Sequence, residues 1–287
     1  MRYSVGLPVD HVGYQDEFVT GDAIAEMAAA VEGAGLDAVF VTDHPAPDDR
    51  WLDGGGHQAQ DPLIALAFAA AATARVMLHT HVFIAAYRNP FLAAKGVATL
   101  QNLSGGRMLL GVAAGYLKPE FAALGVEFDS RNDLLAETIT LMRRAWTEDG
   151  VTAETDRYTA RGVTQLPHPA PVPIWVGGNS TLAMRHAVSL GDGWSPFPNP
   201  PAASRAVKTP AITNLDELAA RLEGARGYAT EIGRTEPLTI CFAPFHATDD
   251  HSTYADLGID WLAVGFPGCT TRAEWLDRVG EFAARVR

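Results

Sequence analysis

The 287-residue chain contains only two cysteines, Cys241 and Cys269. They are too few for a disulfide framework and lack the paired spacing of a zinc site, which indicates a reducing compartment. Long apolar runs are also missing, because the longest, from Leu63 to Ala72, is about half of what a membrane-spanning helix needs. The first residues lack the apolar segment of a signal peptide. We therefore expect a soluble, cytoplasmic protein without a membrane partner.

Basic residues are scarce. Lys and Arg number 22 against 34 Asp and Glu, so the formal net charge is −12. A surface of this sign repels phosphate backbones, so nucleic-acid binding is not expected. Hydrophobic residues make up 47% of the chain and charged residues 20%, without a block of one sign, so the chain should fold around a large core. These balances favour a small-molecule substrate.

Strand-like and helix-like segments alternate along the chain. The continuous apolar run within Asp37 to Thr42 is typical of a parallel strand that is buried on both faces. Asp61-Pro62 and Asn89-Pro90 each place a capping side chain before a proline at the first helical position. About eight such strand-then-helix units predict a (β/α)8 TIM barrel, formed by one domain over residues 1–287.

An open doubly wound sheet is the alternative fold, but its first turn, Pro8 to Gly13, lacks the expected G-x-G-x-x-G. Three long insertions, residues 45–60, 116–129 and 196–210, follow predicted strands. They therefore lie in loops at the C-terminal face, where barrel enzymes build their active sites. Residues 151–173 instead precede a strand and are predicted to form a surface hairpin.

Two predicted strands carry histidines that could take part in chemistry. Asp43-His44 ends one strand, and the alternative to a functional role is a hydrogen bond from His44 to the following loop. His79 and His81 share one face of another strand, a spacing that can bind a metal ion. The other strand ends offer no further His, Cys or carboxylate, so we predict no metal site.

Two glycine-containing segments could accept a ligand. Gly177 to Ser180 joins a strand to a helix N-terminus, which suits a phosphate group, although such a turn can be purely structural. Gly111 to Tyr116 leaves room for a planar group, or packs tightly. No G-x-S-x-G nucleophile motif and no distinctive carboxylate pair occur. The surviving features favour a bound cofactor that carries the chemistry.

Taken in order, these motifs resemble the bacterial luciferase-like monooxygenase family, and in particular its coenzyme F420-dependent oxidoreductase branch. The resemblance covers about residues 2 to 196. It is carried by Asp43-His44, Arg88-Asn89-Pro90, Leu103 to Arg107, Gly111 to Gly115, Glu120-Phe121, Leu124 to Val126, Arg131, Pro173 to Ser180 and Gly191 to Trp194.

The resemblance implies a barrel that binds F420 or a flavin at its C-terminal face, with a non-prolyl cis peptide at His81-Val82. It implies that His44 is the catalytic residue, which transfers a proton or orients the substrate. In most relatives a small residue stands in the place of His81. The implied cofactor-binding residues are Asp43, Thr80, His81, Val82, Ala113, Gly115, Tyr116, Val176, Gly177, Gly178, Asn179 and Ser180.

We predict an F420-dependent oxidoreductase that transfers a hydride between the deazaflavin and a small organic substrate. The alternatives are an FMN-dependent monooxygenase with a separate flavin reductase, and a non-catalytic flavin- or F420-binding barrel. Tyr116 replaces an acidic residue of the related sugar-phosphate dehydrogenases, which argues against a sugar phosphate. A homodimer is implied by the resemblance alone. Because F420 is a polyanion, Arg50, Arg88 and Lys118 are expected as its counter-charges; if none faces the pocket, FMN, or an F420 tail that makes no contact, is favoured.

Overall fold

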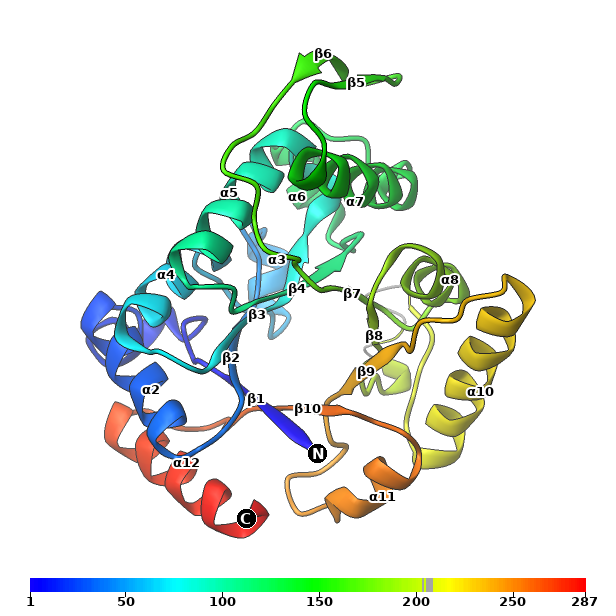
Figure 1. The fold of residues 1–287 in the computed structure, drawn as a ribbon. Helices are drawn as coiled ribbons and strands as arrows, with labels where there is room; N and C mark the ends of the chain where they lie inside the picture. The colour runs from blue at the N-terminus through cyan, green and yellow to red at the C-terminus, as the bar shows by residue number, and fades with distance from the viewer. Residues whose placement is uncertain (203, 205–208) are drawn as a thin grey trace.

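The computed structural model describes residues 1–202, 204 and 209–287. Eight parallel strands close into a barrel in the order β1-β10-β9-β8-β7-β4-β3-β2, which confirms the predicted (β/α)8 fold (Figure 1). The barrel strands are β1 (Arg2–Gly6), β2 (Ala38–Val41), β3 (Met77–Ile84), β4 (Met108–Ala113), β7 (Ile174–Gly177), β8 (Gly193–Ser195), β9 (Thr239–Phe242) and β10 (Trp261–Val264).

Helices surround this barrel, and the predicted caps begin them. Asp61 accepts hydrogen bonds from two backbone amides in the first turn of α4, and Asn89 does the same for α5. The outer ring comprises α2 (Gly21–Gly33), α4 (Pro62–Ala72), α5 (Pro90–Leu103), α7 (Arg131–Thr147), α8 (Thr181–Leu190), α10 (Leu215–Glu231), α11 (His251–Asp256) and α12 (Arg272–Val286). No helix in the described part of the chain has both the length and the apolar character needed to cross a membrane.

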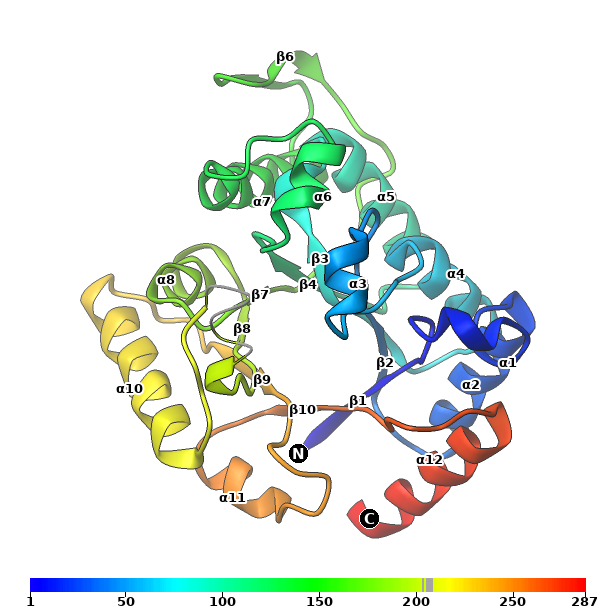
Figure 2. The same cartoon turned by 180° about the vertical axis from the view of Figure 1, so that it is seen from behind.

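Short elements occupy the long connections. The loops after β2 and β4 contain α3 (Asp49–Asp53) and α6 (Lys118–Ala123), which lie over the C-terminal face of the barrel (Figure 2). The predicted hairpin is present as β5 (Val151–Glu154) and β6 (Thr159–Val163), and it projects from the body. Three single turns lie elsewhere in the described part of the chain: η1 (Val12–Tyr14), α1 (Gln15–Phe18) and η2 (Ala85–Tyr87).

The inside of the barrel changes character along its axis. Toward the N-terminal ends of the strands, Leu109, Trp175 and Trp261 form a buried apolar cluster, and the two indole rings lie 5.4 Å apart. Toward the C-terminal ends, Ala113 and Gly177 leave space instead. Large side chains therefore close one end of the barrel, and small ones open the other.

Candidate functional site

A cavity of about 500 Å³ opens at the C-terminal ends of β3, β4, β7 and β8. Backbone and small side chains form much of its wall, and aromatic and aliphatic side chains form the rim. Its described lining is His81, Val82, Ile84, Ala113, Ala114, Gly115, Tyr116, Phe128, Arg131, Asn132, Gly177, Gly178, Ser180, Leu182, Ala183, Ser195, Phe197 and Thr209.

A larger hollow of about 870 Å³ lies at the opposite end of the barrel. Two of its three arginines already have polar partners within the chain. Arg143 pairs with Asp192 at 2.8 Å, and Arg234 donates to four backbone carbonyls. Because these two side chains are already paired, they have little capacity to bind a ligand. In addition, barrel enzymes act at the C-terminal face, not at this one. The smaller cavity is therefore the candidate site.

The floor of this cavity is shaped by β3. The His81-Val82 peptide is cis, as the resemblance implied, and the β3–β4 register shifts between Thr80 and Phe83. A Cβ atom placed on Gly177 would lie 3.0 Å from Val82 Cγ1, which is tighter than ordinary packing. Glycine at position 177 thus keeps the floor open to a flat ligand.

Two polar groups at this floor lack a hydrogen-bond partner among the residues that the structure describes. His81 Nδ1 is buried without one, and burial lowers the pKa of His81 to about 4, so the ring is neutral at pH 7. The Ser195 hydroxyl also lacks a partner that meets hydrogen-bond geometry, although it neighbours the Cys241 thiol. Buried polar groups are normally paired, so a ligand that pairs them is stabilised here.

A second histidine lies deeper inside the barrel. The rings of His79 and His81 are 5.0 Å apart, and His79 Nδ1 lies 3.0 Å from the Ser4 hydroxyl. Burial lowers the pKa of His79 well below its ordinary value. No group of three or more His, Cys, Asp or Glu side chains in the described residues is arranged to hold a metal ion.

One side of the cavity is suited to an anion. Gly178 has φ +122°, and the Ser180 hydroxyl caps α8 by accepting from the Ala183 amide at 3.0 Å. The N-terminus of this ten-residue helix carries partial positive charge. Arg131 is the charged residue among the described lining residues, and its guanidinium lies 4.0 Å from the Phe128 ring centroid.

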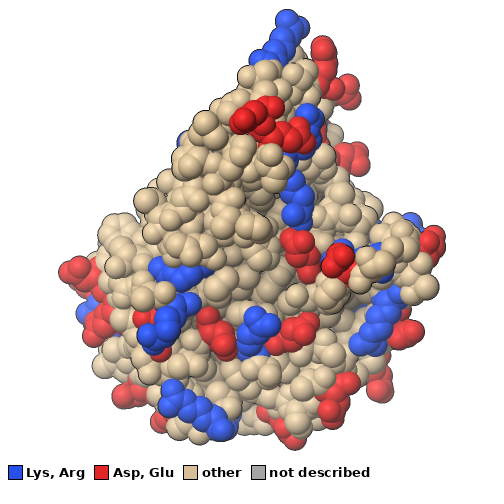
Figure 3. Space-filling model, viewed as in Figure 1, with Lys and Arg blue, Asp and Glu red and all other residues tan. Residues whose placement is uncertain are grey.

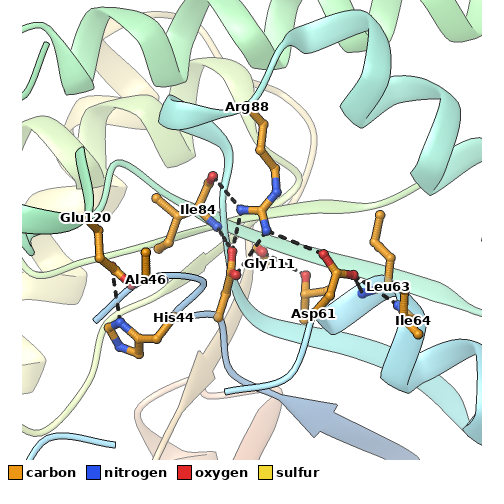
Figure 4. A network of polar contacts seen from close by, with 11 residues as sticks. His44, Ala46, Asp61, Leu63, Ile64, Ile84, Arg88, Gly111 and Glu120 are labelled. Carbon is orange, nitrogen blue, oxygen red and sulfur yellow. Dashed lines mark hydrogen bonds and ion pairs between the residues drawn. The ribbon is translucent and has the colours of Figure 1, made fainter. Parts of the chain in front are cut away.

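The expected counter-charges are placed elsewhere. Arg50, Arg88 and Lys118 are not among the described lining residues. Arg88 instead makes a two-pronged ion pair with Asp43, at 2.5 and 3.0 Å, and lies 3.9 Å from Asp61 (Figure 4). Asp43 also accepts from the Ile84 amide at 2.8 Å, so this pair fixes the end of β3.

His44 stands behind the cavity wall, between two partners. Its Nδ1 lies 3.3 Å from Glu120 Oε2, and its Nε2 lies 3.2 Å from the Tyr116 hydroxyl. Glu120 comes from α6, is 2% exposed, and also accepts from the Ala46 amide (Figure 4). Burial, and then the charge of Glu120, raises the pKa of Tyr116 to about 12. Tyr116 lines the cavity, whereas His44 does not.

The residues predicted from the sequence separate into two groups. Thr80 precedes His81 in β3, and Val176 precedes Gly177 in β7. Because successive strand residues point to opposite faces, Thr80 and Val176 point away from the cavity, and this rule could have excluded them from the sequence alone. Asn179 binds backbone atoms of the loop after β8. Eight predicted residues line the cavity, namely His81, Val82, Ala113, Gly115, Tyr116, Gly177, Gly178 and Ser180, while Asp43, His44, Thr80, Val176 and Asn179 lie around it.

Several residues of the site were not predicted. Arg131 and Glu120 both belong to the motif series, and that was the available signal for them. Ser195 ends β8, but nothing near it in the sequence marks it. Ser195 lies next to Gly177 because β8 pairs with β7 in the closed barrel, and it lines the same cavity as His81.

Comparisons with known proteins show the family of the chain. The sequence profile of the family described as luciferase-like monooxygenase matches residues 1–284. An F420-dependent glucose-6-phosphate dehydrogenase of Intrasporangium calvum is 38% identical over 178 residues, which are 60% of this chain and 52% of that protein. The corresponding protein of Amycolatopsis mediterranei is 35% identical over 191 residues, which are 64% and 56% of the two chains. The chain thus spans about half the length of these curated relatives.

Solved structures share the fold. An F420-dependent secondary alcohol dehydrogenase in complex with an F420-acetone adduct superimposes with a TM-score of 0.71, at 18% identity, over 100% of this chain and 99% of that one. A monooxygenase from Streptomyces bottropensis gives a TM-score of 0.67, at 22% identity, over 100% of this chain and 80% of that one.

Proposed function

Because the chain belongs to the luciferase-like monooxygenase family, we propose that it is an F420-dependent oxidoreductase acting on a small organic substrate. Relatives named as F420-dependent dehydrogenases support the cofactor. The observation that carries the proposal is the cavity floor, where the Val82 side chain faces Gly177 next to two polar groups that have no partner among the described residues.

The residues present fit such a cofactor. When bound, F420 supplies a hydride acceptor or donor. Gly177, Gly178 and Ser180 would hold its phosphate together with Arg131, since backbone amides, a helix N-terminus and a guanidinium are typical phosphate ligands. His81, as a neutral imidazole, would hydrogen-bond the ring system.

The other chain residues manage the proton that accompanies a hydride. His44 exchanges this proton, and its two hydrogen bonds hold the ring in one orientation. The Asp43–Arg88 pair, beneath the same strand end, keeps β3 in place. His44 is only 7% exposed, which limits exchange of the proton with solvent.

A second candidate is an FMN-dependent monooxygenase that works with a separate flavin reductase. It is favoured by one observation: Arg50, Arg88 and Lys118, the expected counter-charges of the F420 tail, are not part of the described lining. FMN lacks that polyanionic tail, so it needs fewer cations.

Titration of the purified protein with each cofactor, followed by fluorescence quenching, separates these candidates. We expect F420 to bind with a Kd in the micromolar range or tighter, and FMN to bind more weakly. Tight FMN binding without F420 binding would establish the second candidate instead. If neither binds, both fail. A non-catalytic barrel would bind the cofactor, and His44→Ala would then have no kinetic effect on any turnover substrate.

We also propose a homodimer through the outer face of α4 and α5. Ile64 and Phe68 on α4, and Leu92 and Leu103 on α5, are each at least half exposed, and Leu103 reaches 80%. Helix α4 has no charged residue, and few charged side chains lie over this flank (Figure 3). In a chain of net charge −12, an uncharged apolar face is where two copies meet with least repulsion.

Sedimentation velocity tests the dimer. The wild-type chain should sediment as a dimer, and the double variant Phe68→Glu/Leu92→Glu should sediment as a monomer with unchanged helical circular dichroism. A wild-type monomer at micromolar concentration would refute this part of the proposal.

A further inference from the structure

We propose that the Tyr116 hydroxyl, and not the His44 ring, contacts the reacting oxygen of the substrate. In this arrangement His44 stores the proton behind Tyr116, and Glu120 is a positioning residue. The substrate is therefore an alcohol, or the matching aldehyde or ketone. The inference rests on the proposed function only for the hydride carrier.

The positions of the three side chains support this order. Tyr116 lines the cavity, whereas both ring nitrogens of His44 are already engaged, one by Tyr116 and one by Glu120. His44 is only 7% exposed. A substrate in the cavity thus meets the Tyr116 side chain before it can reach the imidazole.

The direction of each hydrogen bond follows from the partners. A carboxylate only accepts, so Glu120 Oε2 takes the hydrogen from His44 Nδ1. Nε2 then has a free lone pair and accepts from the Tyr116 hydroxyl. The phenol hydrogen therefore points toward His44, and the phenol oxygen is left to accept from a substrate hydroxyl.

Tyr116 needs His44 as its proton acceptor. Its pKa of about 12 keeps the phenol protonated at pH 7, so alone it is a poor base. With His44 behind it, the phenol passes one proton on as it receives another. The other groups that face His44 are Trp51 and His57, with ring centroids 5.6 and 4.8 Å away. Asp10 adds a negative charge near these rings, because its Oδ2 lies 3.8 Å from His57 Nδ1.

The reaction balances as follows for an alcohol. The C–H bond at the alcohol carbon breaks, and its electron pair leaves with hydrogen as hydride to the cofactor. The O–H bond breaks, and its proton goes to the Tyr116 oxygen while the phenol proton moves to His44 Nε2. A C=O double bond forms, and the resulting imidazolium is stabilised by the Glu120 carboxylate. Carbonyl reduction is the same path reversed.

Turnover by F420-loaded protein tests the role of Tyr116. The probes are propan-2-ol and cyclohexanol with oxidised F420, and acetone and cyclohexanone with reduced F420. We expect at least one pair to react, and Tyr116→Phe to lower kcat by about 100-fold or more with the Kd for F420 unchanged. Tyr87→Phe is the matched control, because Tyr87 is buried but does not line the cavity. It should keep wild-type kcat.

Tautomer measurement tests the positions of the protons without turnover. Long-range ¹H–¹⁵N correlation on ¹⁵N-histidine-labelled protein should show the His44 proton on Nδ1. Glu120→Gln keeps an acceptor, so it should retain this tautomer while kcat falls by about 10-fold.

Three results would overturn the inference: full activity of Tyr116→Phe alongside an inactive His44→Gln, a His44 proton on Nε2, or F420 binding without reaction of any probe. Failure of F420 and FMN to bind would instead refute the proposed function.

Discussion

Buried polar side chains at the two ends of the barrel differ in whether they have hydrogen-bond partners. At the N-terminal end, Arg107 is 9% exposed and donates five hydrogen bonds, four to backbone carbonyls and one to the Thr73 hydroxyl. At the C-terminal end, His81 and Ser195 hold buried atoms without partners in the described part of the chain. Arg107 therefore serves stability, whereas His81 and Ser195 leave capacity for a ligand, so substitutions at these positions should have separable effects.

Removal of Arg107 should have the largest effect. Arg107→Ala should lower the free energy of unfolding by about 3–5 kcal/mol, because several buried carbonyls lose their donor. Urea denaturation measures this. Cofactor affinity of the remaining folded protein should not change, and Arg161→Ala, on the exposed hairpin, is the control. A change in affinity for Arg107→Ala would break the separation between the two ends.

Filling the cavity at the C-terminal end should lower cofactor affinity rather than stability. Gly177→Val should weaken cofactor binding by about 100-fold, equal to about 2.7 kcal/mol, because its side chain would occupy the space beside Val82. Gly280→Val is the control, since nothing lies within 4 Å of a Cβ placed there. Fluorescence titration gives the affinity, and unaltered binding by Gly177→Val would show that the ligand lies elsewhere.

The buried histidines should make the protein sensitive to acid. Their pKa values are lowered in the folded state, so below pH 6.5 the unfolded chain binds protons that the folded chain does not. Stability should therefore fall between pH 6.5 and about 4, by up to about 1.4 kcal/mol per pH unit for each histidine. Urea denaturation at pH 7, 6 and 5 measures this slope.

His81→Asn should reduce that slope, because it removes one of the two groups. His246→Gln, at an exposed site, is the control and should leave the slope as it is. An identical slope in His81→Asn and wild-type protein would contradict the burial argument.

The smallest effect is expected at Ser195. Ser195→Ala should weaken cofactor binding by about 3- to 10-fold, the contribution of one neutral hydrogen bond, with little loss of stability, because the hydroxyl has only the Cys241 thiol as a neighbour and makes no hydrogen bond of ordinary geometry within the described chain. Ser189→Ala on the exposed side of α8 serves as comparison. Loss of stability without loss of affinity would assign Ser195 to the core rather than to the site.

Local signals predicted the elements, and distance in sequence limited the prediction of the site. Asp61 and Asn89 mark helix starts because their partners are only two or three residues away. His44 and Glu120 are 76 residues apart, and no local pattern indicates that α6 brings them together. The short helices α3 and α6 were missed for a related reason: they are too short for a periodic pattern and are held by packing on the barrel mouth.

Asn179 offers a practical point for engineering. Its amide nitrogen donates to the Phe197 and Pro210 carbonyls, and its amide oxygen accepts from the Phe197 amide. One side chain therefore clamps both ends of the loop after β8 to the turn that begins α8. The two ends of this loop and the start of α8 are therefore held together by a single side chain, so one substitution at position 179 would release both anchor points.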